Sequence, residues 1–144
     1  MSLAPDQCRR ILEVTREWVG KAVYTLQAEE CQPPASLNCF LLVAWAFGEA
    51  RIQAPRTLSE QLYWGQCCPP SYTKPGCLIF TSGRNVVSDF VDAKRARHGV
   101  GHVGIIGEGE TVLHACWRRA TVVEDPLEQF LREHAYRGIY QVSG

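Results

Sequence analysis

Two residues of this chain could act together as a nucleophile and a base. Cys39 follows Ser36 and Asn38, which are both good helix caps, and it begins a long apolar run, so we expect it in the first turn of a helix. There the unpaired backbone N–H groups and the helix dipole favour a thiolate. His102 opens a β-branched apolar run that predicts a strand, which would hold a general base rigidly.

A further histidine could orient this base. His114 lies on the next expected strand, where it could hydrogen-bond His102. The order predicts a triad of Cys39, His102 and His114, which needs no metal and no organic cofactor. Each residue alone has a structural alternative, because a lone cysteine in an apolar context is usually a small buried hydrophobe and a lone histidine is usually structural.

The elements that must position these residues are helices followed by strands. We expect helices at residues 6–19, 39–50, 57–64 and 126–134, and strands at residues 77–80, 102–106, 111–115, 120–123 and 139–142. Segments 29–37 and 66–76 are predicted to be a loop and a turn-rich connection, and a hairpin turn is expected at 107–110. The resulting fold class is α+β, with the buried helix of Cys39 packed across an antiparallel sheet that carries both histidines.

Length and charge indicate one compact domain. The chain has 144 residues, which is near the commonest domain size, so we expect residues 1–144 to form a single domain. The formal net charge is zero, which gives no strong field for a polyanion. The basic run at 94–98 is better explained as a solvated loop, so no nucleic-acid partner is expected.

The cysteines and the N-terminal residues bear on the compartment. The seven cysteines are odd in number and include no Cys-x-x-Cys pair, which favours reduced thiols and a cytoplasmic location. Residues 1–10 are polar and show no signal-peptide pattern, so non-classical export or delivery is the alternative. No apolar run approaches the length of a bilayer span, and no membrane partner is expected. The sequence does not indicate an oligomeric state.

Several short motifs resemble, in order, those of one peptidase family. They are Tyr24 upstream of the nucleophile, the helix from Cys39 to Phe47-Gly48, Pro55-Arg56-Thr57 ahead of Glu60-Gln61, Pro75-Gly76 before an apolar strand, His102-Val103-Gly104-Ile105, and Leu113-His114-Ala115. Each motif is weak alone. Together they run from about residue 24 to 123 and resemble the NlpC-like (NlpC / p-sixty superfamily) papain-like cysteine peptidases.

The resemblance implies a papain-like NlpC-type fold and an activity. The expected enzyme is a cysteine hydrolase that cleaves an amide bond in peptidoglycan stem peptides, of the γ-D-glutamyl–diamino-acid endopeptidase type, and its partner is a peptidoglycan-derived peptide. The catalytic residues would be Cys39, His102 and His114. The residues expected near the substrate are Tyr24, Asn38, Phe40 and Arg56.

The chain also departs from the family pattern. The usual Asp-Cys-Ser-Gly is replaced by Asn38-Cys39-Phe40-Leu41, Cys77 stands where an Asp is usual, and extra residues at 84–98 precede the His102 strand. We predict that this insertion gates the cleft and sets substrate choice, with a solvated surface loop as the alternative. The alternative functions are a papain-like amidase, acyltransferase or deamidase acting on a protein or lipid, and a non-catalytic domain of the same fold.

Overall fold

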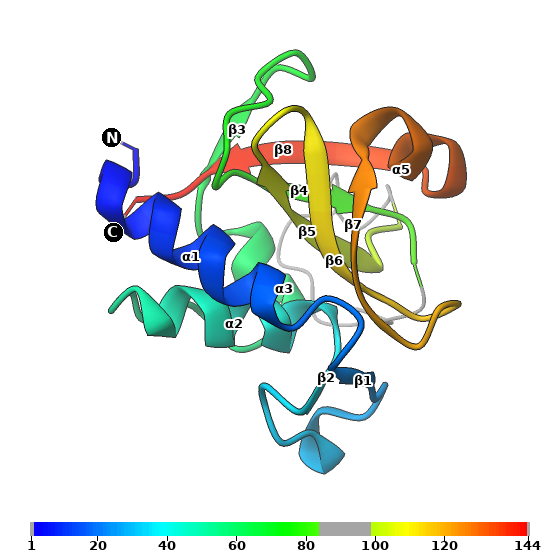
Figure 1. Cartoon of the computed structure of the whole chain (residues 1–144). Helices are drawn as coiled ribbons and strands as arrows, with labels where there is room; N and C mark the ends of the chain where they lie inside the picture. Colours follow the sequence, from blue (N-terminus) through cyan, green and yellow to red (C-terminus); the bar gives the residue numbers. More distant parts are fainter. Residues whose placement is uncertain (1, 84–98, 144) are drawn as a thin grey trace.

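An antiparallel sheet forms the centre of the structure, a computed structural model that describes residues 2–83 and 99–143 (Figure 1). Six described strands form this sheet, in the order β3 (Gln66–Cys68), β8 (Tyr136–Gln141), β4 (Leu78–Thr81), β5 (His102–Gly107), β6 (Thr111–Cys116) and β7 (Thr121–Pro126). All neighbouring pairs are antiparallel. This confirms the predicted α+β fold. The segment 84–98, which was predicted to gate the cleft, lies outside the described residues.

Helices cover both faces of the sheet. The described helices are α1 (Pro5–Glu17), α2 (Cys39–Glu49), α3 (Leu58–Leu62), α5 (Leu127–Glu133) and the short 3-10 helix η1 (Ala28–Glu30). Helix α2 packs against α1, β5 and β6, whereas α5 packs against β6 and β7. Figure 1 shows α1, α2 and α3 together beside the sheet and α5 apart from them. Within the described ranges, no helix combines the length and the apolar character that a membrane crossing requires.

The sheet buries apolar side chains on both faces. Leu78 and Phe80 of β4 lie in a core cluster with residues of α1 and α2, whereas Ile79 lies in a cluster with Phe130 of α5. This alternation follows from the period of two residues in a β-strand. Burying one such large side chain stabilises the fold by about 1.5–3 kcal/mol. The two clusters therefore hold the strands of the histidines between packed layers.

The strands differ from the prediction mainly where pairing is long-range. Segment 66–76 was predicted to be turn-rich, but it contains β3, whose Cys67 pairs with Tyr140 of β8. Segment 29–37 was predicted to be a loop, but it contains η1 and strand β2 (Ser36–Leu37), which pairs in parallel with β1 (Val23–Tyr24). Both predictions were wrong for one physical reason: such short strands are stabilised by partners distant in sequence and have no periodicity of their own. The remaining element boundaries differ from the prediction by at most three residues.

Candidate active site

A cavity opens at the end of the sheet where β4 ends and β5 begins. Its volume is about 570 Å³, and the residues that line it include Tyr24, His102, Cys116, Arg119 and His134. These residues come from β1, the start of β5, the end of β6, the β6–β7 turn and the residue after α5. The cavity is therefore built where several elements terminate, which is a common location for binding and catalysis.

A chain of hydrogen bonds leads from this cavity into the protein interior. His102 Nε2 lies 2.9 Å from His114 Nδ1, and His114 Nε2 lies 2.8 Å from Asp125 Oδ2. Arg119 donates to both oxygens of Asp125, with Nη1 at 2.8 Å from Oδ1. His102, His114 and Asp125 are 6%, 0% and 3% exposed. The three buried side chains of His102, His114 and Asp125 are thus linked in one network that starts at the cavity wall, and the exposed Arg119 closes it at Asp125.

The network defines which nitrogen of each ring carries the proton. The ionised carboxylate of Asp125 can only accept, so His114 donates from Nε2–H and its Nδ1 is the acceptor. His102 must then donate from Nε2–H to His114 Nδ1. His102 Nδ1 therefore carries the unprotonated lone pair. A ring in this tautomer can accept a proton from a nucleophile.

Electrostatics keep both rings neutral near neutral pH. Burial lowers the pKa of His102 well below its ordinary value, and His114 and His134 lower that pKa further. Burial also lowers the pKa of His114, against the raising effect of Asp125. Burial alone would raise the pKa of Asp125, but hydrogen bonds from His114 and Arg119 outweigh it and hold this pKa below the ordinary range. A neutral imidazole backed by an ionised carboxylate is the form that general-base catalysis requires.

The predicted nucleophile begins α2. Cys39 is the first residue of this helix, as predicted, and Asn38 caps it by accepting a hydrogen bond from the Leu41 N–H at 3.0 Å. The other end of the Asn38 amide donates to the Leu26 carbonyl at 3.1 Å. Asn38 and Cys39 are both 0% exposed. Asn38 therefore positions the start of α2, and its amide is occupied by backbone groups rather than directed to a ligand.

Cys39 and the two histidines have different buried neighbours. The rings of His102 and His114 contact Phe130 of α5, whereas Val103 lies in the core cluster that contains Cys39. Among the described residues, Cys116 is the cysteine that lines the cavity.

The other residues expected near the substrate are distributed unevenly. Tyr24 lines the cavity with His102, and its backbone N–H donates to the Ala120 carbonyl at 3.0 Å, which places β1 beside the β6–β7 turn. Phe40 is half-buried and packs against the core. Arg56 is exposed in the segment before α3 and is outside the cavity lining that the described residues form. Only Tyr24 of this group is thus brought beside His102.

Sequence reasoning missed three members of the site. Asp125 lies in β7, beyond the predicted end of that strand, and Arg119 lies in the β6–β7 turn. His134 follows α5, and its ring stacks on His102 with centroids 4.9 Å apart and planes 13° apart. The one available signal was the acidic pair Glu124-Asp125, which follows the apolar run Val122-Val123. Of this pair, Asp125 is buried, and a buried carboxylate needs a partner.

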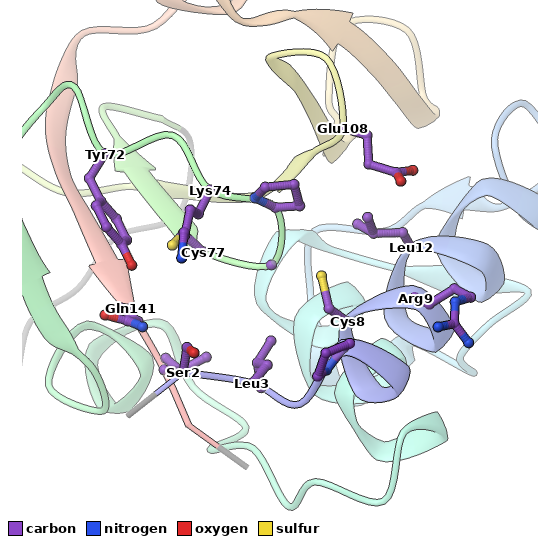
Figure 2. A pocket seen from close by; sticks show the side chains of 14 residues that line it. Ser2, Leu3, Cys8, Arg9, Leu12, Tyr72, Lys74, Cys77, Glu108 and Gln141 are labelled. Carbon is purple, nitrogen blue, oxygen red and sulfur yellow. The ribbon is translucent and has the colours of Figure 1, made fainter.

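A second cavity lies at the opposite end of the same strands. It has a volume of about 470 Å³ and is lined by the start of α1, residues 72–77, Glu108 and the end of β8. Figure 2 shows the thiols of Cys8 and Cys77 from two sides of this space. Burial raises the pKa of Cys8 and raises the pKa of Cys77 to about 11. These thiols are therefore poor candidates for an activated nucleophile.

Comparison with solved structures establishes the fold. A lipoprotein-like protein of the NLP/p60 family from Staphylococcus aureus gives a TM-score of 0.74 at 22% identity, over 100% of this chain and 44% of its own length. The peptidoglycan hydrolase RipB from Mycobacterium tuberculosis gives a TM-score of 0.68 at 18% identity, over 95% of this chain and 65% of its own length. The NlpC/p60 domain of the peptidoglycan hydrolase SagA gives a TM-score of 0.69 at 17% identity, over 94% of this chain and 98% of its own length. The chain therefore has the NlpC/p60 fold, as its motifs predicted.

The likeness is one of structure. No protein-family model and no curated protein matches the sequence. The chain spans less than half of the staphylococcal protein, at 44% of its length, and nearly all of the SagA domain, at 98%. The region shared with these proteins thus has the fold of their NlpC/p60 domains, which occurs in peptidoglycan hydrolases.

Proposed function

We propose that the protein is a cysteine hydrolase of amide bonds with Cys39 as nucleophile, His102 as base and His114 as orienting residue. The observation that carries the proposal is the buried hydrogen-bond chain from His102 through His114 to Asp125 at the wall of a cavity. The fold, which is shared with RipB and SagA, supports it. The position of Cys39 at the start of α2 is also consistent with this role.

Each group has a defined part in the proposed reaction. His102 Nδ1 takes the proton of Cys39, and the thiolate attacks the amide carbonyl. The backbone N–H of Cys39, in the first turn of α2, is the proposed donor that stabilises the oxyanion. The charged form of His102 is stabilised by His114, which is oriented by Asp125. His102 then protonates the leaving amine, and water hydrolyses the thioester.

We further propose a peptidoglycan stem peptide as substrate, cleaved at a γ-D-glutamyl–diamino-acid bond. The family resemblance of the motifs and the names of RipB and SagA as peptidoglycan hydrolases support this choice. The cavity at His102 contributes Tyr24 as an aromatic wall and Arg118 as an exposed cation that a substrate carboxylate could approach. A cytoplasmic location, predicted from the thiols, is proposed with it, and muropeptides would then be the form of the substrate.

Digestion of purified muropeptides followed by mass spectrometry tests the proposal. We expect cleavage between D-glutamate and the diamino acid with the native protein and none with Cys39→Ala. Cys116→Ala is the matched control, because Cys116 lines the same cavity on the face of the histidines. Activity that survives Cys39→Ala and is lost in Cys116→Ala would assign the nucleophile to Cys116. Absence of cleavage with the native protein, together with turnover of a protein or lipid amide, would replace the substrate class.

A further inference from the structure

Three imidazole rings meet at the inner wall of the cavity. His134 is half-buried at the end of α5, stacks on His102 and lies edge-on to His114 with centroids 5.5 Å apart. One ring nitrogen from each of the three residues can be chosen so that all three atoms lie within 4.8 Å of one another. The proposed reaction uses His102 and His114 but gives no task to His134.

The outer hydrogen bonds of this cluster match those of histidines that bind metals. His114 Nε2 is bonded to Asp125, and His134 Nδ1 lies 3.2 Å from the Phe130 carbonyl. Ligating histidines usually donate their second nitrogen to a carboxylate or a backbone carbonyl, which orients the first nitrogen toward the ion. These contacts leave His114 Nδ1 and His134 Nε2 as the inward nitrogens. His102 Nε2 is already 2.9 Å from His114 Nδ1.

We propose that His102, His114 and His134 form a binding site for a divalent transition metal ion of the zinc class. Three neutral imidazoles suit Zn²⁺ or Co²⁺, whereas Mg²⁺ and Ca²⁺ require oxygen ligands. Zinc–nitrogen bonds of about 2.0–2.1 Å bring three tetrahedral ligand atoms to roughly 3.3 Å from one another. The most distant nitrogen therefore moves inward by about 1.5 Å on binding. The half-buried ring of His134 supplies this movement by tilting out of its stack on His102, since parallel rings cannot both direct their lone pairs at one ion.

The ion would switch off the proposed active site, a consequence that rests on the proposed function. Without the ion, His102 Nε2–H donates to His114 Nδ1, and His102 Nδ1 can accept a proton. With the ion, His102 Nε2 and His114 Nδ1 both give their lone pairs to the metal. The proton of His102 Nε2 moves to Nδ1 of the same ring, and no proton is released. His102 Nδ1–H can then no longer accept the proton of Cys39, and the base is lost.

Cobalt(II) absorption and calorimetry on the full chain test the site directly. We expect one equivalent of Co²⁺ with the visible spectrum of a tetrahedral site and without a thiolate-to-cobalt charge-transfer band. His134→Gln should weaken binding at least about 10-fold. Cys67→Ser, which removes an exposed thiol, should leave binding unchanged. Unchanged affinity in His134→Gln, or a charge-transfer band that Cys67→Ser removes, would overturn the histidine site.

A second measurement separates the site from the proposed function. Zn²⁺ at the concentration that saturates the site should inhibit muropeptide hydrolysis, and a chelator should restore it. Hydrolysis that continues at full occupancy would refute the switch. Histidine-dependent Co²⁺ binding by a protein that hydrolyses no amide would leave the metal site standing and remove the proposed function, whereas hydrolysis without Co²⁺ binding would do the reverse.

Discussion

The two cavities of this molecule sit at opposite ends of the same strands and are similar in volume, at about 570 and 470 Å³. Both contain cysteine and charged side chains. They differ in whether their titratable side chains are hydrogen-bonded to one another. In the cavity lined by His102 (the His102 cavity), buried hydrogen bonds link His102, His114 and Asp125. In the cavity lined by Cys8 (the Cys8 cavity), burial raises the pKa of the thiols of Cys8 and Cys77. Linked titratable groups, rather than cavity size, therefore distinguish the end of the sheet that can support acid–base chemistry.

The largest expected difference between the two ends is in the cysteines. Cys39→Ala should reduce kcat/KM for muropeptide cleavage on the order of 10⁴-fold or more, because it removes the atom that forms the covalent intermediate. Cys8→Ala, at the other end of the strands, should leave kcat/KM unchanged. Circular dichroism should show that both variants remain folded. Equal losses in the two variants would erase the functional distinction between the cavities.

The two histidines should contribute unequally within the His102 cavity. His102→Ala should reduce the rate on the order of 10²–10⁴-fold, because the base both activates the thiol and protonates the leaving group. His114→Asn should retain measurable activity, since an amide can still accept a hydrogen bond from His102 Nε2–H. Steady-state kinetics at saturating substrate measure both. If His114→Asn is as damaging as His102→Ala, the roles must be exchanged or merged.

Asp125 should matter through His114 rather than through the substrate. Asp125→Asn should lower kcat by about 10- to 100-fold with little change in KM, because the neutral amide orients His114 less strongly than the carboxylate does. Glu124→Gln is a matched control on the same strand, since Glu124 pairs with Arg16. This control should leave kcat unchanged. A change in KM that exceeds the change in kcat would instead place Asp125 in substrate binding.

The smallest expected effect is on the free energy of unfolding. The groups at the His102 cavity should lower it at acid pH, and those at the Cys8 cavity should lower it at alkaline pH. The folded-state pKa values of His102 and His114 are lowered, so the unfolded chain binds protons first and the free energy of unfolding falls as the pH drops below about 6.5. The lowered pKa of Asp125 extends this loss below about pH 3.9. The raised pKa values of Cys8 and Cys77 make the free energy of unfolding fall as the pH rises above about 8.5.

Thermal unfolding across pH separates these contributions. His114→Gln should flatten the acid side of the Tm profile and leave the alkaline side unchanged. Cys8→Ala should flatten the alkaline side alone. A variant that changes both sides equally would show that the two ends are coupled through the sheet.

The elements that carry the site could be predicted because their signals are local. The cap of Asn38 and the apolar run after it located α2, and the β-branched run after His102 located β5. The contact between His102 and His114 was also within reach of the sequence, since the hairpin turn at 107–110 brings the two strands into register. These predictions rest on patterns that span a few residues.

The rest of the network depends on packing between distant elements. His134 reaches His102 only because α5 folds back over β6 and β7, and Arg119 reaches Asp125 across the β6–β7 connection. No motif or periodicity in the chain predicts these contacts. The cavity lining itself is assembled from five separate segments, so it could not be predicted from any one of them.

The buried amide of Asn38 also constrains how this chain can evolve. The NlpC-like pattern has an aspartate at this position, and an ionised carboxylate could still accept from the Leu41 N–H. It would lack a donor for the Leu26 carbonyl, which lies 3.1 Å from Asn38 Nδ2. Asn38→Asp is therefore a change that requires residues 25–26 to take another path first. The departure from the family motif at this position is thus matched by a backbone carbonyl twelve residues earlier in the chain, which an amide can bind and an ionised carboxylate cannot.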